Sequence, residues 1–175
     1  MERIVYLERE SIIADVRRPA CDHDWIEHAR TLQAEVEARL TGATIAIVNK
    51  LVLDAATIAR LPMLKMIAVA ATGTNNVDLD ACRARGIVVS NIRGYAVHTV
   101  PEHAIALMLA LSRNLIAYRD SVQAGRWQES EQFCFFDHPI RDLHGATLAV
   151  IGSGSLGDGV VRLAEAFGMR VLKAE

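Results

Sequence analysis

The chain has 175 residues and a mass of 19.2 kDa, with 51% hydrophobic and 23% charged residues. This composition provides for a hydrophobic core and excludes an intrinsically disordered chain. The 19 lysines and arginines are balanced by 21 acidic residues, so no nucleic-acid or membrane partner is expected. No apolar run reaches the ~20 residues of a membrane span. Three widely spaced cysteines favour reduced thiols and a cytoplasmic location.

The N-terminal half alternates between short apolar runs and helical patterns. Strands are predicted at Ile4–Leu7, Thr44–Val48, Met66–Ala70 and Ile87–Val89, and helices at Ile26–Leu40, Asp54–Leu61 and from Asp78 to Arg85. The middle two strands are continuous apolar runs, typical of strands buried on both faces. Because strands alternate with helices, the connections are expected to be crossovers and the sheet parallel.

A long helix is predicted from Thr99 to Ala124. Thr99 and Glu102 have the spacing of a capping box, in which each side chain bonds to the other residue's backbone N–H. The segment Ala104–Leu111 is apolar on all sides, so we expect this half of the helix to be buried between layers or between subunits. The residues from 126 to 144 contain one tryptophan and three phenylalanines, and an irregular segment anchored by aromatic rings is expected there.

A glycine-rich turn follows the next buried-strand run, Thr147–Ile151, and leads into a helix and another strand. A G-x-G-x-x-G sequence in this context is the fingerprint of dinucleotide binding. Gly152 permits the tight turn, Gly154 lets the backbone approach a pyrophosphate, and Gly157 lets the helix pack closely on the strand. The N–H groups at the start of the helix, at Ser155 and Leu156 among others, then hold the phosphate charge.

An acid should follow the fingerprint at the end of the second strand, where it binds the adenosine ribose. Glu175 lies 18 residues after Gly157 and fits this position. A carboxylate there favours NAD over NADP, because it repels a 2′-phosphate. Two neighbours fit less well: Asp158 brings negative charge toward the pyrophosphate, and Gly159 costs the helix about 1 kcal/mol relative to alanine. A glycine-rich turn without a ligand is the alternative.

Several segments together resemble the D-isomer-specific 2-hydroxyacid dehydrogenases. The segments that carry this resemblance are Ala71–Asp78, Arg85–Tyr95 and Val100–His103, while Gly125–Trp127 and Phe133–Asp137 are similar to the glycerate dehydrogenase, or hydroxypyruvate reductase, branch. The resemblance implies an α/β fold, with a flavodoxin-like parallel-sheet substrate domain over residues 1–98. Residues 99–175 would then hold the long interface helix, the aromatic segment and the first β-α-β unit of a Rossmann NAD-binding domain, truncated at its end.

The resemblance also implies an activity: NAD-dependent hydride transfer between NADH and a small 2-keto acid such as hydroxypyruvate or glyoxylate, by a homodimer formed through the long helix. The backbone N–H groups of Thr72 and Gly73 would bind the substrate carboxylate. Lys50 would face the same cleft, or would be a solvated lysine at the end of a strand. Thr99 would approach the cofactor, or would serve only as a helix cap.

The catalytic residues of the family are an arginine, an acid and a histidine, and all three are expected downstream of Glu175. We therefore expect the 175-residue chain to be a fragment that is inactive by itself. No His or Cys spacing typical of a metal site is present in the sequence. The alternative function is a non-enzymatic NAD(H)-sensing binding or scaffold protein of the same fold.

Overall fold

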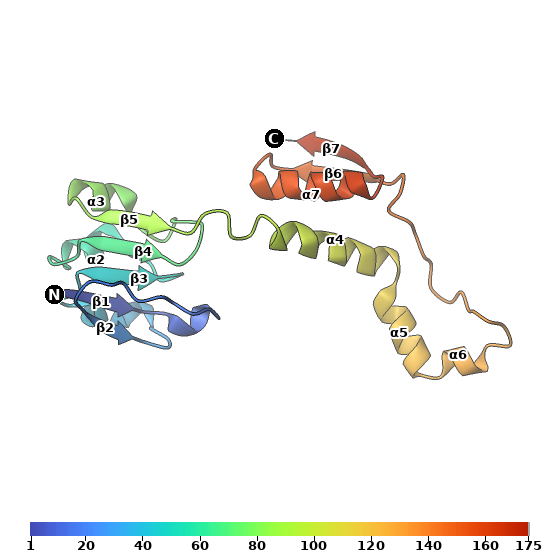
Figure 1. Ribbon diagram of the computed structural model, residues 1–175, viewed down its shortest axis with the longest axis horizontal. Helices are drawn as coiled ribbons and strands as arrows, with labels where there is room; N and C mark the ends of the chain where they lie inside the picture. Colours follow the sequence, from blue (N-terminus) through green and yellow to red (C-terminus); the bar gives the residue numbers. More distant parts are fainter. Residues whose placement is uncertain (175) are drawn as a thin grey trace. The chain divides into compact units, whose positions relative to one another are not determined.

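The computed structural model describes residues 1–174, and the chain divides into two compact units, Met1–Arg93 and Gly94–Glu175. The first unit contains a five-stranded parallel sheet (Figure 1). Its strands are β1 (Glu2–Tyr6), β2 (His23–Glu27), β3 (Ile45–Val48), β4 (Met66–Val69) and β5 (Val88–Asn91). The spatial order β2-β1-β3-β4-β5 is flavodoxin-like, which confirms the expected fold class.

Three short helices complete this unit: α1 (Val36–Leu40), α2 (Ala55–Ala59) and α3 (Leu79–Ala84). Their apolar residues pack into one core with alternate residues of the strands, among them Val48 and Ile67. β3 and β4 each alternate between half-buried and fully buried residues. The prediction that these strands are buried on both faces is therefore wrong for the described residues, because the three helices join the core on one face of the sheet.

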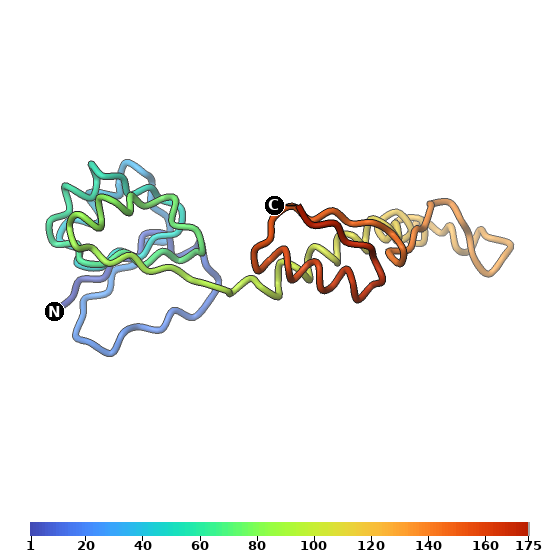
Figure 2. Tube along the Cα trace, turned by 90° about the horizontal axis from the view of Figure 1, so that it is seen from above, coloured from blue at the N-terminus to red at the C-terminus, as the bar shows by residue number. Residues whose placement is uncertain are grey.

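The prediction of a helix over Ile26–Leu40 is also wrong. The first part of that range belongs to β2, which pairs with β1 from Glu2↔His23 to Tyr6↔Glu27, and only α1 and a preceding single turn are helical. The pairing with β2 satisfies the backbone N–H and C=O groups on the outer edge of β1. This tertiary requirement overrides the helix propensity of the residues that form β2. The connection from β1 to β2 runs in a wide excursion that is clear in Figure 2, where it is coloured blue.

The second unit contains four helices and two strands within the described residues. They are α4 (Thr99–Ser112), α5 (Leu115–Gln123), α6 (Arg126–Glu129), β6 (Thr147–Ile151), α7 (Ser155–Ala166) and β7 (Arg170–Ala174). β6 and β7 are parallel and are connected by α7, so the expected first β-α-β unit is confirmed. α4 packs along α7, as Figure 1 shows.

The long helix predicted from Thr99 to Ala124 is interrupted. Asn114 has a left-handed backbone with φ 49° and separates α4 from α5. Asparagine adopts this conformation more readily than most residues. The break is tied to the segment after α6, because the Asn114 side chain donates to the Pro139 carbonyl and the Arg141 N–H donates to the Ser112 carbonyl at 2.8 Å.

The apolar half of α4 is buried on one side only. Pro101 and Ile105 are buried, whereas Leu107 is half exposed and Leu111 is 77% exposed. The described residues supply α7 on one side of α4 and leave the other side open, so burial of that side between subunits stays a prediction. Among residues 1–174, no helix combines the length and the hydropathy needed to cross a bilayer.

Candidate functional site

Two loops at the carboxyl edge of the five-stranded sheet carry the predicted substrate contacts. Lys50 follows β3, Thr72 and Gly73 follow β4, and all three are exposed. Ligands of parallel sheets bind beyond this edge. The backbone N–H groups of Thr72 and Gly73 donate to no backbone carbonyl within residues 1–174. They are therefore available to an external acceptor such as a carboxylate.

Two asparagines that the sequence reasoning did not single out hold these loops. The Asn91 side chain, at the end of β5, donates to the Thr72 carbonyl at 2.6 Å. The buried Asn76 side chain donates to the Leu51 carbonyl at 2.9 Å, and the Asn76 carbonyl accepts from the Leu53 N–H at 2.8 Å. Asn76 therefore ties the loop after β3 to the loop after β4. The available signal was that both asparagines lie within the segments that carry the family resemblance.

The glycine-rich turn between β6 and α7 has the geometry that a dinucleotide requires. Gly152 has φ +105°, which favours glycine, and its N–H donates to the Ala174 carbonyl at 2.8 Å. A Cβ atom on Gly157 would overlap the carbonyl oxygen of Gly152, so only glycine allows the helix to start this close to the turn. A Cβ atom on Gly154 would meet nothing within 4 Å, so the backbone there is open to a ligand.

The start of α7 is free to bind an anion. Gly154 is the N-cap residue and has no side chain to satisfy the first N–H groups of the helix, which include those of Ser155, Leu156 and Gly157. These groups and the positive end of the helix dipole are suited to the negative charge of a pyrophosphate. The residues present therefore fit a dinucleotide cofactor.

The two residues that seemed unfavourable for this site have structural explanations. The Asp158 carboxylate lies 3.2 Å from the Lys173 ammonium group of β7, and this partner offsets its negative charge. A Cβ atom on Gly159 would lie 2.5 Å from Cγ of Pro101 and 3.2 Å from the Val97 carbonyl oxygen. Glycine at 159 thus allows α7 to approach the first turn of α4.

The predicted capping box at the start of α4 is not formed. The N-cap residue is His98, no side chain caps the helix, and Thr99 is already helical. The Val100 N–H bonds to the Ala96 carbonyl at 3.1 Å, so the helical path begins before Thr99 and leaves it no capping position. Thr99 is exposed in the first turn of the helix that packs on α7.

Two further expectations concern the acid and the metals. Glu175, proposed to bind the ribose, lies outside the described residues. Within residues 1–174, no group of three or more His, Cys, Asp or Glu side chains is arranged to hold a metal ion.

A flavodoxin-like sheet and a β-α-β unit with this glycine-rich turn define an α/β protein of the dinucleotide-binding class. Residues 7–167 match the family described as D-isomer specific 2-hydroxyacid dehydrogenase, catalytic domain. The chain belongs to this family, and the resemblance noted in the sequence is confirmed.

Similar proteins agree with this assignment. The chain is 49% identical to glycerate dehydrogenase of Methylorubrum extorquens over 172 residues, which are 98% of this chain and 55% of that protein. It is 33% identical to hydroxypyruvate reductase of Blautia hydrogenotrophica, over 79% of this chain and 43% of that protein. The solved structure of the TT0316 protein from Thermus thermophilus superimposes with a TM-score of 0.77 at 27% identity, over 98% of this chain and 55% of that one. The chain thus spans about half the length of these relatives.

Proposed function

We propose that this protein acts as an NAD-dependent oxidoreductase of the 2-hydroxyacid dehydrogenase type, with a small 2-keto acid such as hydroxypyruvate or glyoxylate as substrate. The observation that carries the proposal is the glycine-rich turn before α7, which leaves the first N–H groups of this helix without a side-chain cap. The chain that carries this turn belongs to the family named above. NAD, when bound, supplies the hydride chemistry. The chain's own part is to hold the pyrophosphate with the N–H groups of Ser155, Leu156 and Gly157.

The proposed substrate contacts lie in the loop after β4. Thr72 and Gly73 would donate their free N–H groups to the substrate carboxylate, and Asn91 would keep them in place through the Thr72 carbonyl. Lys50 would add positive charge at the same edge of the sheet. Thr99 would contribute to the cofactor side from the first turn of α4, and Glu175 would bind the adenosine ribose, which favours NAD. No residue of this chain is assigned the catalytic roles of arginine, acid or histidine.

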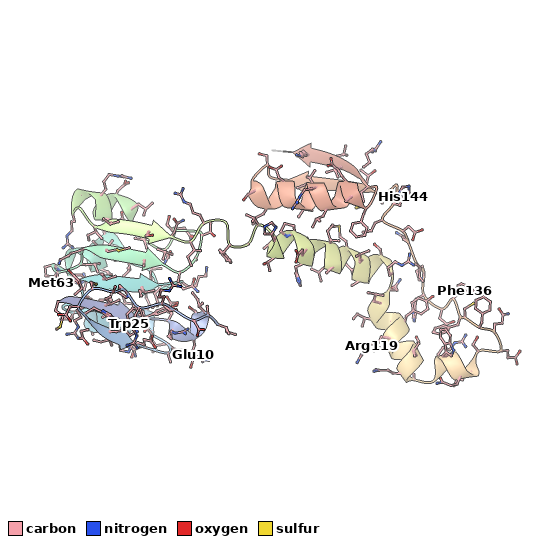
Figure 3. All side chains as sticks on the ribbon, in the orientation of Figure 1. Glu10, Trp25, Met63, Arg119, Phe136 and His144 are labelled. Carbon is pink, nitrogen blue, oxygen red and sulfur yellow. The ribbon has the colours of Figure 1, made fainter. Side chains whose placement is uncertain are left out.

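We further propose a homodimer that uses the open side of α4, α5, α6 and the aromatic segment that follows α6. The support is the number of exposed large apolar side chains in this region, since such patches mark association surfaces. The exposed side chains are Leu107, Leu111, Leu115, Ile116, Trp127, Phe133 and Phe136. Figure 3 labels Phe136 on the segment that follows α6 and Arg119 on α5. A cytoplasmic location is supported by three free cysteines.

Cofactor binding tests the proposed function directly. NADH should bind the 175-residue chain, and Gly154→Val should weaken binding by about tenfold or more, because the valine side chain fills space that a pyrophosphate needs. Nothing lies within 4 Å of a Cβ at this position, so the fold should be unaffected. Isothermal titration calorimetry measures the affinity, and circular dichroism checks the fold.

The matched control is Glu165→Ala, an exposed change on the same helix, which should bind NADH like the wild type. Equal NADH affinity in wild type and Gly154→Val, or no binding by the wild type, would count against a dinucleotide at this turn. Turnover is not the readout here, because the proposed roles of this chain are binding roles.

A further inference from the structure

Three consecutive backbone N–H groups in the loop after β3 point at one carboxylate of the chain itself. Oε2 of Glu8 accepts from the N–H groups of Asn49 at 2.7 Å, Lys50 at 3.0 Å and Leu51 at 3.2 Å. The second oxygen, Oε1, lies 3.2 Å from the Lys50 nitrogen. Glu8 is half buried and lies two residues after Tyr6, the last residue of β1. A run of N–H groups that converge in this way forms an anion-binding concavity.

The position of this concavity in the fold is the one where a ligand would be expected. In a sheet of order β2-β1-β3-β4-β5, ligands bind at the point between β1 and β3 where the strand order reverses. Glu8 leaves β1 and Asn49 leaves β3, so their hydrogen bond spans that point. The anion that occupies it in this chain is a side chain.

The same loop is coupled to the proposed substrate contacts. Leu51 donates its N–H to Glu8 and accepts from the Asn76 side chain, which belongs to the loop after β4. Glu8 therefore holds the loop after β3, and Asn76 connects that loop to the loop after β4, which carries Thr72 and Gly73. With the Asn49–Leu51 groups satisfied by Glu8, the exposed N–H groups of Thr72 and Gly73 remain open to a substrate.

We propose that Glu8 is a specificity-determining residue that closes the concavity between β1 and β3 to phosphate. A phosphate group would have to displace the Glu8 carboxylate from three N–H groups and would be repelled by its charge. The site would therefore select acids with a single carboxylate over phosphorylated 2-hydroxy or 2-keto acids. The substrate class in this statement rests on the proposed function, whereas the closure of the concavity does not.

The test is a titration of the 15N-labelled 175-residue chain with inorganic phosphate, followed at the amide signals of Asn49, Lys50 and Leu51. Wild type should show no saturable shift at these amides. Glu8→Ala, which frees the three N–H groups, should show saturable shifts at these amides, with a phosphate affinity at least about tenfold above the upper limit set by wild type, since charge-assisted bonds to an anion are the strong ones. Glu10→Ala is the matched control. It removes the same charge from the same segment, and its carboxylate pairs with Arg30 (Glu10 is labelled in Figure 3).

Saturable binding to wild type at these amides, or equal phosphate affinity in Glu8→Ala and Glu10→Ala, would overturn the proposal. If Glu8→Ala fails to fold, Glu8→Gln is the variant to test, because glutamine keeps a hydrogen-bond acceptor but removes the charge. A Glu8→Gln chain that binds phosphate no better than wild type would also overturn the proposal. A separate titration with D-glycerate, followed at Thr72 and Gly73, tests the proposed function. Its failure would be distinguishable, because the phosphate titration uses no substrate.

Discussion

Gly159 lies in the second turn of α7, where helix propensity and packing oppose each other. Alanine would favour the helix by about 1 kcal/mol relative to glycine. Its Cβ, however, would lie 2.5 Å from the Pro101 ring and 3.2 Å from the Val97 carbonyl. Neither neighbour is the end of a flexible side chain, so the helices would have to separate. Overpacking of this kind typically costs about 1–3 kcal/mol, and the packing term should exceed the gain in propensity.

Gly159→Ala should therefore lower the stability of the second unit, despite being the better helix former. Urea denaturation followed by Trp127 fluorescence, in a background where Trp25 is replaced by Phe, measures the change. Glu165→Ala, on an exposed position of α7, should change the free energy of unfolding by less than about 0.5 kcal/mol. An increase in stability for Gly159→Ala would show that α4 and α7 adjust freely at this contact.

At the scale of elements, the short helices of the first unit depend on their caps. α2 has five residues and α3 has six, so neither would persist alone in water. The Asp54 carboxylate accepts from the Thr57 N–H at 2.8 Å, and the Asp78 carboxylate accepts from the Ala81 N–H at 2.9 Å. Each helix then buries a residue in the core, Ile58 and Cys82 respectively.

The cap of α2 predicts a pH dependence. Hydrogen bonds from the Thr57 hydroxyl, and then from the Thr57 N–H, lower the pKa of Asp54 below its ordinary value of 3.8. Because the folded pKa is the lower one, this stabilisation is complete above the unfolded pKa and is lost as the pH falls through the folded pKa. The stability advantage of wild type over Asp54→Ala should thus be constant above about pH 5 and shrink as the pH falls through and below 3.8. Urea denaturation at several pH values measures it.

Asp80→Ala provides the comparison, since Asp80 is an exposed acid of α3 that pairs with Arg83 at the surface. Such pairs contribute little, so its effect on stability should be small at every pH. An Asp54→Ala effect that stays constant as the pH falls would contradict the role of the charged cap.

The elements that the sequence predicted correctly are those whose signal is local. β1, β3 and β4 were predicted from apolar runs, α3 from its Asp78 cap and Gly86, and α7 from the fingerprint and its apolar face. β2 was missed because its pairing with β1 depends on a distant segment. The break at Asn114 was missed because residues near Pro139 and Arg141 hold it.

For the whole molecule, the largest consequence lies in the apolar surface of the second unit. Exposed large apolar side chains lie on α4, on α5 and in the aromatic segment, and exposed apolar surface of this kind favours association. The chain is therefore expected to self-associate in solution.

Leu111→Glu should weaken that association by about tenfold or more, because it places a charge in an apolar interface. Sedimentation equilibrium measures the dimer dissociation constant. Gln123→Glu adds the same charge at an exposed polar position of α5 and should have little effect. A wild-type chain that is monomeric at all accessible concentrations, or a Leu111→Glu chain that associates like wild type, would contradict the proposed dimer surface.

The sequence by itself determined the fold class, the family and the cofactor turn. All three depend on features that residues close together in the sequence determine. These features are the apolar runs of the strands, the glycines at fixed spacing and the residues that end the helices. Only the tertiary structure decided which residues hold the substrate loops and what fills the point between β1 and β3. Glu8 reaches Asn49 across 41 positions, and Asn76 reaches Leu51 across 25. Such hydrogen bonds form only after the strands are aligned, and no local pattern in the chain specifies them.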